Sequence, residues 1–253
     1  MEVIFLGTGT SQGIPVIGCN CKVCCSKDDK DKRLRSSLFI KSNNTNILID
    51  AGPDFRQQML RENINKLDAV VFTHEHIDHI AGLDDIRAFN HISDSPMEVY
   101  AEKRVLNALK KTFSYIFDNS HYPGIPHLNL NVIGEDKFKI HEVEIEPIRV
   151  LHYNLPILGF KINELAYITD ANFISKEQLL KLKSLKVLII NALRIRKHVS
   201  HFSLSEAIEI IKICNPDMAY LTHISHQLGL HEEVNQFLSE NIRLTFDQHK
   251  IYL

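Results

Sequence analysis

Residues 73–79 read Thr73-His74-Glu75-His76-Ile77-Asp78-His79, and they follow an apolar run of strand character and precede a helical pattern. Neutral imidazole nitrogens and carboxylate oxygens are the ligands that suit Zn²⁺, Mn²⁺ or Fe²⁺. A loop at a strand end can direct His74 and His76 to one side and Asp78 and His79 to the other. The segment therefore predicts ligands for two divalent ions. The alternative is a solvated loop whose histidines bind nothing.

Two coordination shells need more donors than this loop supplies, so the same hypothesis predicts further ligands at other strand ends. Three residues each follow an apolar run as His74 does, namely His152, Asp170 and His223. Taken singly, they have other interpretations: a core histidine, the N-cap of a helix and a turn residue, respectively. Because all three repeat the same placement, we interpret them together as ligands.

The cysteines predict a second metal site, since four of the five lie within residues 19–25. Cys19, Cys21 and Cys24 have the spacing C-x-C-x-x-C, and a tetrahedral zinc site needs a fourth ligand. His226, three residues after His223, can supply it. The alternatives are reduced surface cysteines, or Cys25 in place of one of the three thiols. Cys214 stands alone in an apolar stretch and is expected to be an inert buried thiol.

The amino-acid composition and net charge exclude several classes of protein. The chain has 253 residues, 44% hydrophobic and 24% charged, which excludes disorder. A net charge of -2 gives no overall field for a polyanion, so nucleic acid is not an expected partner. No apolar run approaches the roughly 20 residues of a membrane span, and Met1–Phe5 contains no basic leader. We expect a cytoplasmic protein without a membrane partner.

The pattern of elements indicates an α/β (α+β) chain whose residues 1–253 form a single domain. It has two strand-rich halves that meet near residue 130, and no linker or repeat separates them. This order of strands and helices along the chain is consistent with two packed sheets that are covered by helices on their outer faces. A capping box at 203–206 starts a helix just after His201. Strands are expected at 3–6, 38–40, 47–49, 69–72, 128–132, 138–150, 158–162, 166–168 and 218–221, and further helices at 55–61, 83–91 and 103–117.

The pattern T-H-x-H-x-D-H, followed in order by His, Asp and His at strand ends, resembles the metallo-β-lactamase superfamily over nearly the whole chain. The resemblance implies a four-layer αββα sandwich with a dinuclear site at the edges of the two sheets. Asp50, before Ala51-Gly52, resembles the family's structural Asp-Gly turn, which supports the site without binding metal. The resemblance further implies that one ion binds His74, His76 and His152, that the other binds Asp78, His79 and His223, and that Asp170 bridges both.

Four motifs narrow this resemblance to one subgroup: G-T-G-T-S-Q-G-I-P, G-C-x-C-x-x-C, T-H-x-H-x-D-H-x-x-G-L and L-T-H-I-S-H-Q. That subgroup contains the phosphoribosyl 1,2-cyclic phosphate phosphodiesterase, and ribonuclease Z and the coenzyme PQQ biosynthesis protein B are more distant relatives. The resemblance implies a small phosphodiester substrate, two active-site Mn²⁺ or Zn²⁺ ions, one structural Zn²⁺ and a homodimer. It matches His201 to a histidine that reaches the substrate, so we predict His201 and Asp78 as catalytic residues. A plain loop histidine is the alternative for His201.

The predicted function is phosphodiester hydrolysis by a water that two metal ions activate. The alternatives are a ribonuclease Z-like endoribonuclease, a thioester or lactone hydrolase, and a metal-dependent carrier protein without turnover. The glycine-rich segment 8–13 lacks a P-loop lysine and is interpreted as a backbone turn. The basic stretch with Arg33, Arg35, Ser36 and Ser37 is assigned to the solvated surface, and contacts to a substrate phosphate are the alternative. The remaining histidines are assigned to the surface or to packing: His91, His121, His127, His141, His198, His231 and His249.

Overall fold

The strands form two sheets in the computed structural model, which describes residues 1–118 and 124–253. The first sheet has seven strands in the order β15-β1-β2-β3-β4-β5-β6. The second has eight, in the order β11-β8-β9-β10-β12-β13-β14, with β7 paired to β8. The first sheet contains β1 (Glu2–Gly7), β2 (Ser37–Ser42), β3 (Thr45–Ile49), β4 (Ala69–Val71), β5 (Met97–Ala101), β6 (Leu128–Val132) and β15 (Lys250–Tyr252). The second contains β7 (Phe138–Ile140), β8 (Val143–His152), β9 (Leu155–Ile162), β10 (Leu165–Ile168), β11 (Phe173–Ile174), β12 (Val187–Asn191), β13 (Met218–Thr222) and β14 (Ile242–Leu244).

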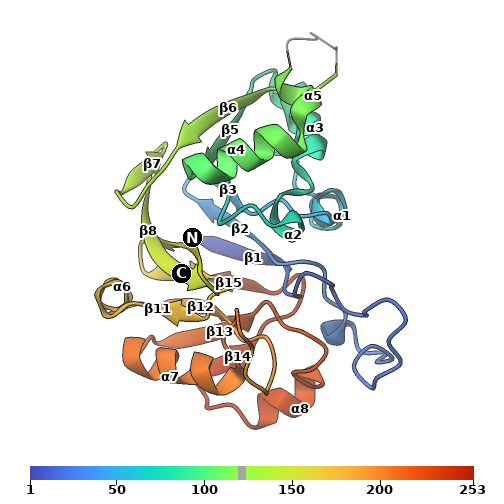
Figure 1. Ribbon diagram of the computed structural model, residues 1–253, viewed down its shortest axis with the longest axis vertical. Coiled ribbons are helices and arrows are strands. Elements are labelled where there is room, and N and C mark those ends of the chain that lie inside the picture. Colours follow the sequence, from blue (N-terminus) through green and yellow to red (C-terminus); the bar gives the residue numbers. More distant parts are fainter. Residues whose placement is uncertain (119–123) are drawn as a thin grey trace.

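Helices cover the outer face of each sheet, and Figure 1 shows α3 and α4 beside β5 in the upper half of the molecule and α7 and α8 below β13. On the first sheet lie α1 (Phe55–Arg61), α2 (Ile77–Ile80), α3 (Arg87–Ser93), α4 (Lys103–Thr112) and α5 (Ser114–Phe117). On the second lie α6 (Lys176–Lys181), α7 (Leu204–Cys214) and α8 (His231–Gln236). Short 3₁₀ turns occur at Asp29–Asp31 and Leu83–Ile86. The expected capping box is present at the start of α7.

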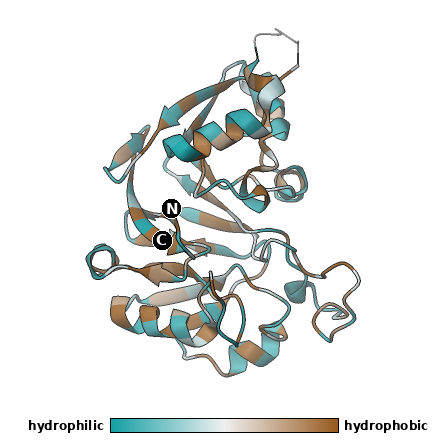
Figure 2. Ribbon diagram, in the orientation of Figure 1, coloured by the Kyte–Doolittle hydropathy of each residue, from teal (hydrophilic) through white to brown (hydrophobic). Residues whose placement is uncertain are grey.

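Alternation along the strands explains why the sheets are sandwiched, because successive side chains point to opposite faces. In β1, Val3 and Phe5 pack between the two sheets, while Ile4 and Leu6 face the helices. In β12, Ile189 belongs to the core between the sheets, and its neighbours on either side belong to the core beneath α7. The strands are accordingly mostly hydrophobic in Figure 2, whereas α4 has a hydrophobic and a hydrophilic side. The predicted αββα sandwich is confirmed.

Several element boundaries differ from the prediction. The expected strand 138–150 is wrong as a single element, because His141 adopts a left-handed conformation (φ 50°) and turns the chain between β7 and β8. The expected helix 103–117 is interrupted at Phe113, which separates α4 from α5. The halves meet between β6 and β7, close to the predicted place, but β15 returns to the first sheet and pairs with β1.

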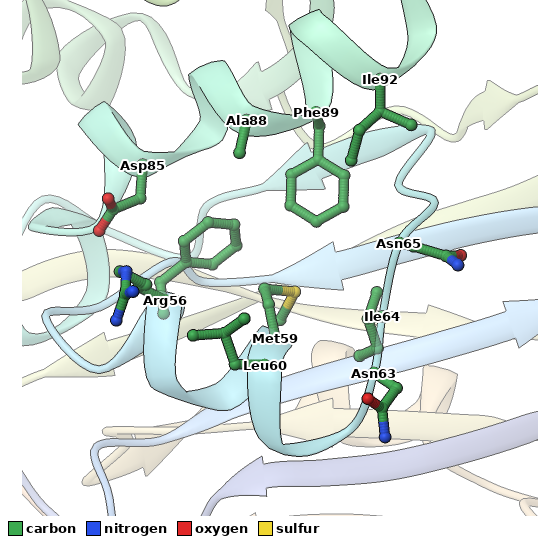
Figure 3. A pocket seen from close by; sticks show the side chains of 11 residues that line it. Arg56, Met59, Leu60, Asn63, Ile64, Asn65, Asp85, Ala88, Phe89 and Ile92 are labelled. Atoms are coloured by element: carbon green, nitrogen blue, oxygen red, sulfur yellow. The ribbon is translucent and has the colours of Figure 1, made fainter.

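An apolar groove of about 420 Å³ lies between α1 and α3. Figure 3 shows Met59, Leu60 and Ile64 facing Phe89 and Ile92 across it. None of the predicted metal ligands lines this groove. Within the described ranges, no helix has the combined length and apolar character that a bilayer span requires.

Candidate metal centre

The loop after β4 is held by a buried carboxylate at the end of the neighbouring strand. β3, β4 and β5 are parallel, so the segments after β3 and β4 emerge side by side. Asp50 accepts hydrogen bonds from the Thr73 backbone N–H (2.9 Å) and from the Thr73 hydroxyl (2.9 Å). Its Oδ2 also lies 2.7 Å from His79 Nδ1. Asp50 therefore orients this loop from behind.

The second sheet brings the other predicted ligands to the same edge of the sandwich. β10, β12 and β13 are parallel, and β8 runs in the same direction because β9 is antiparallel to both β8 and β10. His152 ends β8, while Asp170 and His223 follow β10 and β13 in left-handed conformations (φ 59° and 53°). The buried amide of Asn191 bonds both backbone groups of Ala171 and fixes the turn that presents Asp170.

The structure brings together all seven residues that the dinuclear hypothesis requires. In each group of three, the ligand atoms lie within 4.8 Å of one another. Asp170 belongs to several of these groups and lies between the loop of the first sheet and the loops of the second. The groups are His74, His76 and His152; His74, His79 and Asp170; Asp78, Asp170 and His223; and His152, Asp170 and His201.

The histidines present defined nitrogens to the cluster. The Thr73 hydroxyl donates to Asp50, so its oxygen is free to accept from His74 Nδ1, 2.9 Å away. His152 Nδ1 lies 2.7 Å from the Asp170 carbonyl oxygen. Because Nδ1 of these rings faces a protein acceptor, Nε2 faces the cluster. His76 is the exception, with its Nδ1 3.0 Å from His74 Nε2.

The charges and the burial of these side chains make the cluster suited to a cation. Burial by itself would lower the pKa of His79, but the carboxylates of Asp78, Asp170 and Asp50 hold it well above its ordinary value. Burial would raise the pKa of Asp170, yet His223 and His79 keep it well below the usual range. Burial also lowers the pKa of His223 to about 3. A divalent ion would take the place of the His79 proton among these carboxylates.

An unpartnered nitrogen shows that these residues fit a metal ion. His79 Nε2 is buried and forms no hydrogen bond within the described part of the chain. It lies 3.2 Å from Asp78 Oδ2 and 3.3 Å from Asp170 Oδ2. Buried polar atoms normally have partners, and imidazole nitrogen with carboxylate oxygen is a usual donor set for divalent transition metals. The cluster is therefore chemically suited to divalent metals.

The thiol cluster fits a single tetrahedral ion. The Sγ atoms of Cys19, Cys21 and Cys24 lie 3.3, 3.4 and 3.5 Å from His226 Nδ1. Sulfur and nitrogen bound to one tetrahedral zinc are separated by about 3.5 Å, so the four atoms already have the required spacing. Cys25 is exposed and lies outside the cluster.

The pKa values of the clustered thiols differ from one another. The backbone N–H of Cys24 donates to Cys21 Sγ (3.4 Å) and lowers the pKa of Cys21 to about 6. Burial raises the pKa of Cys24 to about 11. A bound cation would stabilise all three thiolates. Cys214 is buried, as expected, and its burial raises the pKa to about 11.

His201 lies against the cluster from the segment before α7. Its Nε2 is 3.2 Å from Asp170 Oδ1, and its Nδ1 is 3.0 Å from the Ser200 hydroxyl and 3.2 Å from His198 Nδ1. Beside it is a hollow of about 220 Å³ that also reaches His226. Polar side chains predominate among the residues that line it: Thr10, Ser11, Gln12, Leu193, Arg194, His198, His201, Ser225, His226 and Gln227.

Of the four residues assigned to the solvated surface in the stretch 33–37, Arg33, Ser36 and Ser37 are buried, so the assignment is wrong for these three. The Arg33 guanidinium donates to the Thr8 hydroxyl (2.8 Å) and to the Thr245 carbonyl oxygen (2.5 Å). These residues lead into β2, where loops from both halves cover them. Arg35 instead pairs with Asp54 (3.0 Å).

Among the histidines assigned to surface or packing, His231 is buried and His91, His127 and His141 are exposed. His249 is partly buried and stacks on Phe5. The expectation for His121 falls outside the described residues.

Comparisons with known proteins agree with this architecture. Residues 45–224 match the family described as the beta-lactamase superfamily domain. A crystal structure described as a new diphosphatase from the PhnP family superposes with a TM-score of 0.93 and 37% identity, over 99% of this chain and 96% of that one. Zn²⁺-bound PqqB from Methylobacterium extorquens has the same fold, with a TM-score of 0.82, 16% identity and full coverage of both chains.

A curated relative from Porphyromonas gingivalis, named octanoyltransferase, is 45% identical over 98% of this chain. The chain spans only 50% of that relative's length. The family match covers well over half of this chain, and the PhnP-family structure is similar over nearly all of it. The chain therefore belongs to the metallo-β-lactamase superfamily of hydrolases, within which it resembles the PhnP family.

Proposed function

We propose that this protein is a metal-dependent phosphodiesterase that opens a small cyclic phosphate such as phosphoribosyl 1,2-cyclic phosphate. The observation that carries the proposal is the set of seven ligand side chains, which fall into overlapping groups, all but one of which contain Asp170. The similarity to a diphosphatase of the PhnP family supports phosphoryl chemistry. Two divalent ions in such a site, Mn²⁺ or Zn²⁺, lower the pKa of water and neutralise charge on a phosphoryl oxygen.

Each ligand has a proposed place. One ion would be held by His74, His76 and His152, whose ligand nitrogens form one compact group. The other would be held by Asp78, His79 and His223, with Asp170 available to both. The four-residue site of Cys19, Cys21, Cys24 and His226 would hold a structural Zn²⁺.

His201 is the proposed general acid. Hydrolysis forms one P–O bond from water and breaks the P–O bond to the leaving sugar oxygen, which then needs a proton. His201 Nε2 lies at the cluster, 3.2 Å from Asp170 Oδ1, and can donate at that point. Its Nδ1 faces Ser200 and His198, which orient the ring.

The hollow beside His201 supports a small substrate. Its volume of about 220 Å³ and its lining of hydroxyl, amide and imidazole groups suit a hydroxylated sugar phosphate. The net charge of -2 gives no general attraction for a polynucleotide. A small phosphodiester is therefore the proposed partner of the site.

The test follows the opening of phosphoribosyl 1,2-cyclic phosphate by phosphorus NMR with Mn²⁺-loaded protein. Asp78→Ala removes a proposed ligand and should lower turnover by about 100-fold or more. The control is Asp29→Ala, which removes an exposed carboxylate that is not a proposed ligand and should leave turnover unchanged. Unchanged turnover in Asp78→Ala would overturn the catalytic assignment. No opening by the intact protein would remove the cyclic phosphate as substrate.

A second candidate is hydrolysis of an acyl thioester, which the name of the 45% identical relative favours. The same preparation is given an octanoyl thioester, and thiol release is followed with a colorimetric reagent. Metal-dependent thiol release without opening of the cyclic phosphate would transfer the assignment to thioesters. The reverse result would support the phosphodiesterase.

A further inference from the structure

One ligand of the proposed centre, His223, needs a defined tautomer, and this requirement rests on the proposed metal function. His223 Nε2 faces the cluster, 3.2 Å from Asp170 Oδ1. A neutral imidazole carries its hydrogen on one nitrogen only, and the nitrogen that binds metal must be the one without it. The hydrogen of His223 must therefore be on Nδ1, which requires an acceptor on that side of the ring.

Ser36 provides that acceptor. Its hydroxyl is buried, donates to the Gly9 carbonyl oxygen (2.9 Å) and lies 3.2 Å from His223 Nδ1. Because the hydroxyl hydrogen is used on Gly9, the oxygen faces His223 as an acceptor. Thr169 Oγ1 is a more distant second acceptor at 3.4 Å, and it already donates to Asp170 Oδ2 (2.5 Å).

The glycine-rich segment 8–10 holds Ser36 and the His223 loop together. On one side, Gly9 N–H donates to the Leu34 carbonyl oxygen (2.8 Å), and Ser36 N–H donates to Gly9 (3.0 Å). On the other side, Ile224 N–H donates to the Thr8 carbonyl oxygen (2.9 Å), and Thr10 N–H donates to Ile224 (3.0 Å). The segment thus forms backbone pairs with both chains whose side chains meet.

Glycine is needed here because the backbones approach closely. A Cβ added at Gly7 would lie 1.9 Å from the Arg35 carbonyl oxygen, and one added at Gly9 would lie 3.0 Å from the Arg33 carbonyl oxygen. The G-T-G-T motif at residues 7–10 is therefore explained by the contact that it makes possible between β2 and the loop after β13.

We propose that Ser36 is a positioning residue that fixes His223 with its hydrogen on Nδ1 and Nε2 toward the metal, and that the segment 8–10 aims the Ser36 hydroxyl. The contact joins residues 187 positions apart in sequence. It makes the ligand geometry of the second sheet depend on the strand β2 of the first.

The test compares Ser36→Ala with Ser42→Ala, a buried serine at the far end of β2. Ser36→Ala should weaken one of the two Mn²⁺ equivalents by about 10- to 100-fold, measured by titration, and leave the other unchanged. In the metal-free protein at pH 7, the Ser36 oxygen at Nδ1 and Asp170 Oδ1 at Nε2 compete for the single imidazole hydrogen of His223, so nitrogen-15 NMR should show a measurable fraction with Nδ1 protonated. Ser36→Ala should shift this imidazole toward the tautomer with its hydrogen on Nε2, while Ser42→Ala changes neither reading.

An unchanged tautomer together with unchanged Mn²⁺ affinity in Ser36→Ala would overturn the inference. Ser36→Cys, which keeps a weaker acceptor, should change both quantities in the same direction but less, and it provides the test should the alanine variant unfold. The tautomer is read without metal or substrate. Failure of the inference about Ser36 is therefore distinguishable from failure of the phosphodiesterase proposal, which would appear as absent turnover in the wild-type protein.

Discussion

At the scale of single residues, His201 is placed to act on a leaving group. It is a neighbour of His152, with ring centroids 4.7 Å apart, and its Nε2 faces Asp170. Two roles are compatible with that position: proton donor to the leaving oxygen, and an additional ligand. The chemistry of the leaving group separates them, because only a poor leaving group requires protonation.

His201→Gln should lower turnover of an alkyl phosphodiester by about 10²- to 10⁴-fold and leave the metal content unchanged. Turnover of a nitrophenyl ester should fall much less, since nitrophenolate leaves without a proton. The control is His91→Gln, an exposed histidine that is not part of the metal-ligand groups. Loss of metal in His201→Gln would show that His201 is a ligand.

A second residue-scale prediction concerns acid stability. Burial, with Arg33 and Lys30 nearby, lowers the pKa of His231 to about 4 from 6.5. Between these values the unfolded chain binds the proton and the folded chain does not, so the free energy of unfolding falls as the pH drops through this window. The loss reaches about 3 kcal/mol at pH 4 and below.

His231→Gln should therefore lose less stability than the wild type between pH 7 and pH 4, as measured by urea unfolding. The exposed His91→Gln should follow the wild-type profile. Acid effects of the metal-binding histidines are common to all three proteins and cancel in the comparison. If the free energy of unfolding depended on pH identically in His231→Gln and the wild type, the lowered pKa of His231 would be contradicted.

At the scale of elements, the turn after β1 depends on a close backbone approach. Gly7→Ala places a Cβ 1.9 Å from the Arg35 carbonyl oxygen, so the backbone must move. We expect it to lower the free energy of unfolding by about 3 kcal/mol or more. Gly134→Ala is the matched control, because nothing lies within 4 Å of the added Cβ and the change should be about 0.5 kcal/mol or less. Equal denaturation midpoints for Gly7→Ala and Gly134→Ala would refute this account.

The prediction of elements succeeded where a pattern is local and failed where the chain turns without a strong signal. The apolar runs at 47–49 and 69–72 correspond to β3 and β4, since alternation and flanking polar residues lie within a few positions. The turn at His141 was missed because no glycine, proline, asparagine or aspartate within residues 138–146 marks it. β15 was missed because three residues are too few for a periodic signal.

At the scale of the whole molecule, the thiol site connects the N-terminal loop to the C-terminal half. Cys19, Cys21 and Cys24 meet His226, which lies three residues beyond His223. The blue loop near α8 in Figure 1 contains these cysteines. Two exposed ion pairs also link this loop to α8, but such pairs contribute little. A Zn²⁺ bound by these four residues, as proposed, would be the stronger connection between the two segments.

Cys21→Ser should remove the proposed structural zinc, lower the melting temperature by several degrees and speed proteolysis within residues 16–31. Cys25→Ser alters an exposed thiol outside the cluster and should match the wild type. Zinc content is measured by elemental analysis and cleavage sites by mass spectrometry. Full zinc content in Cys21→Ser would contradict the assignment of the four ligands.

The sequence by itself determined the αββα architecture and predicted which side chains gather at the sheet edges. It could do so because apolar strand runs are local, because candidate ligands directly follow them, as His74 and Asp170 do, and because the motif at 73–79 resembles that of a known superfamily. Parallel strands then bring such positions to one edge. The thiol spacing was equally local, and only His226 had to come from far along the chain.

Only the tertiary structure decided the contacts that orient these side chains. Ser36 and Arg33 were assigned to the surface because a short polar stretch before a strand is usually solvated. Both are buried because the two sheets pack together and loops from each half close over that stretch. The contact of Ser36 with His223 follows from strand register and sheet packing, which depend on the whole core and have no signature within either segment.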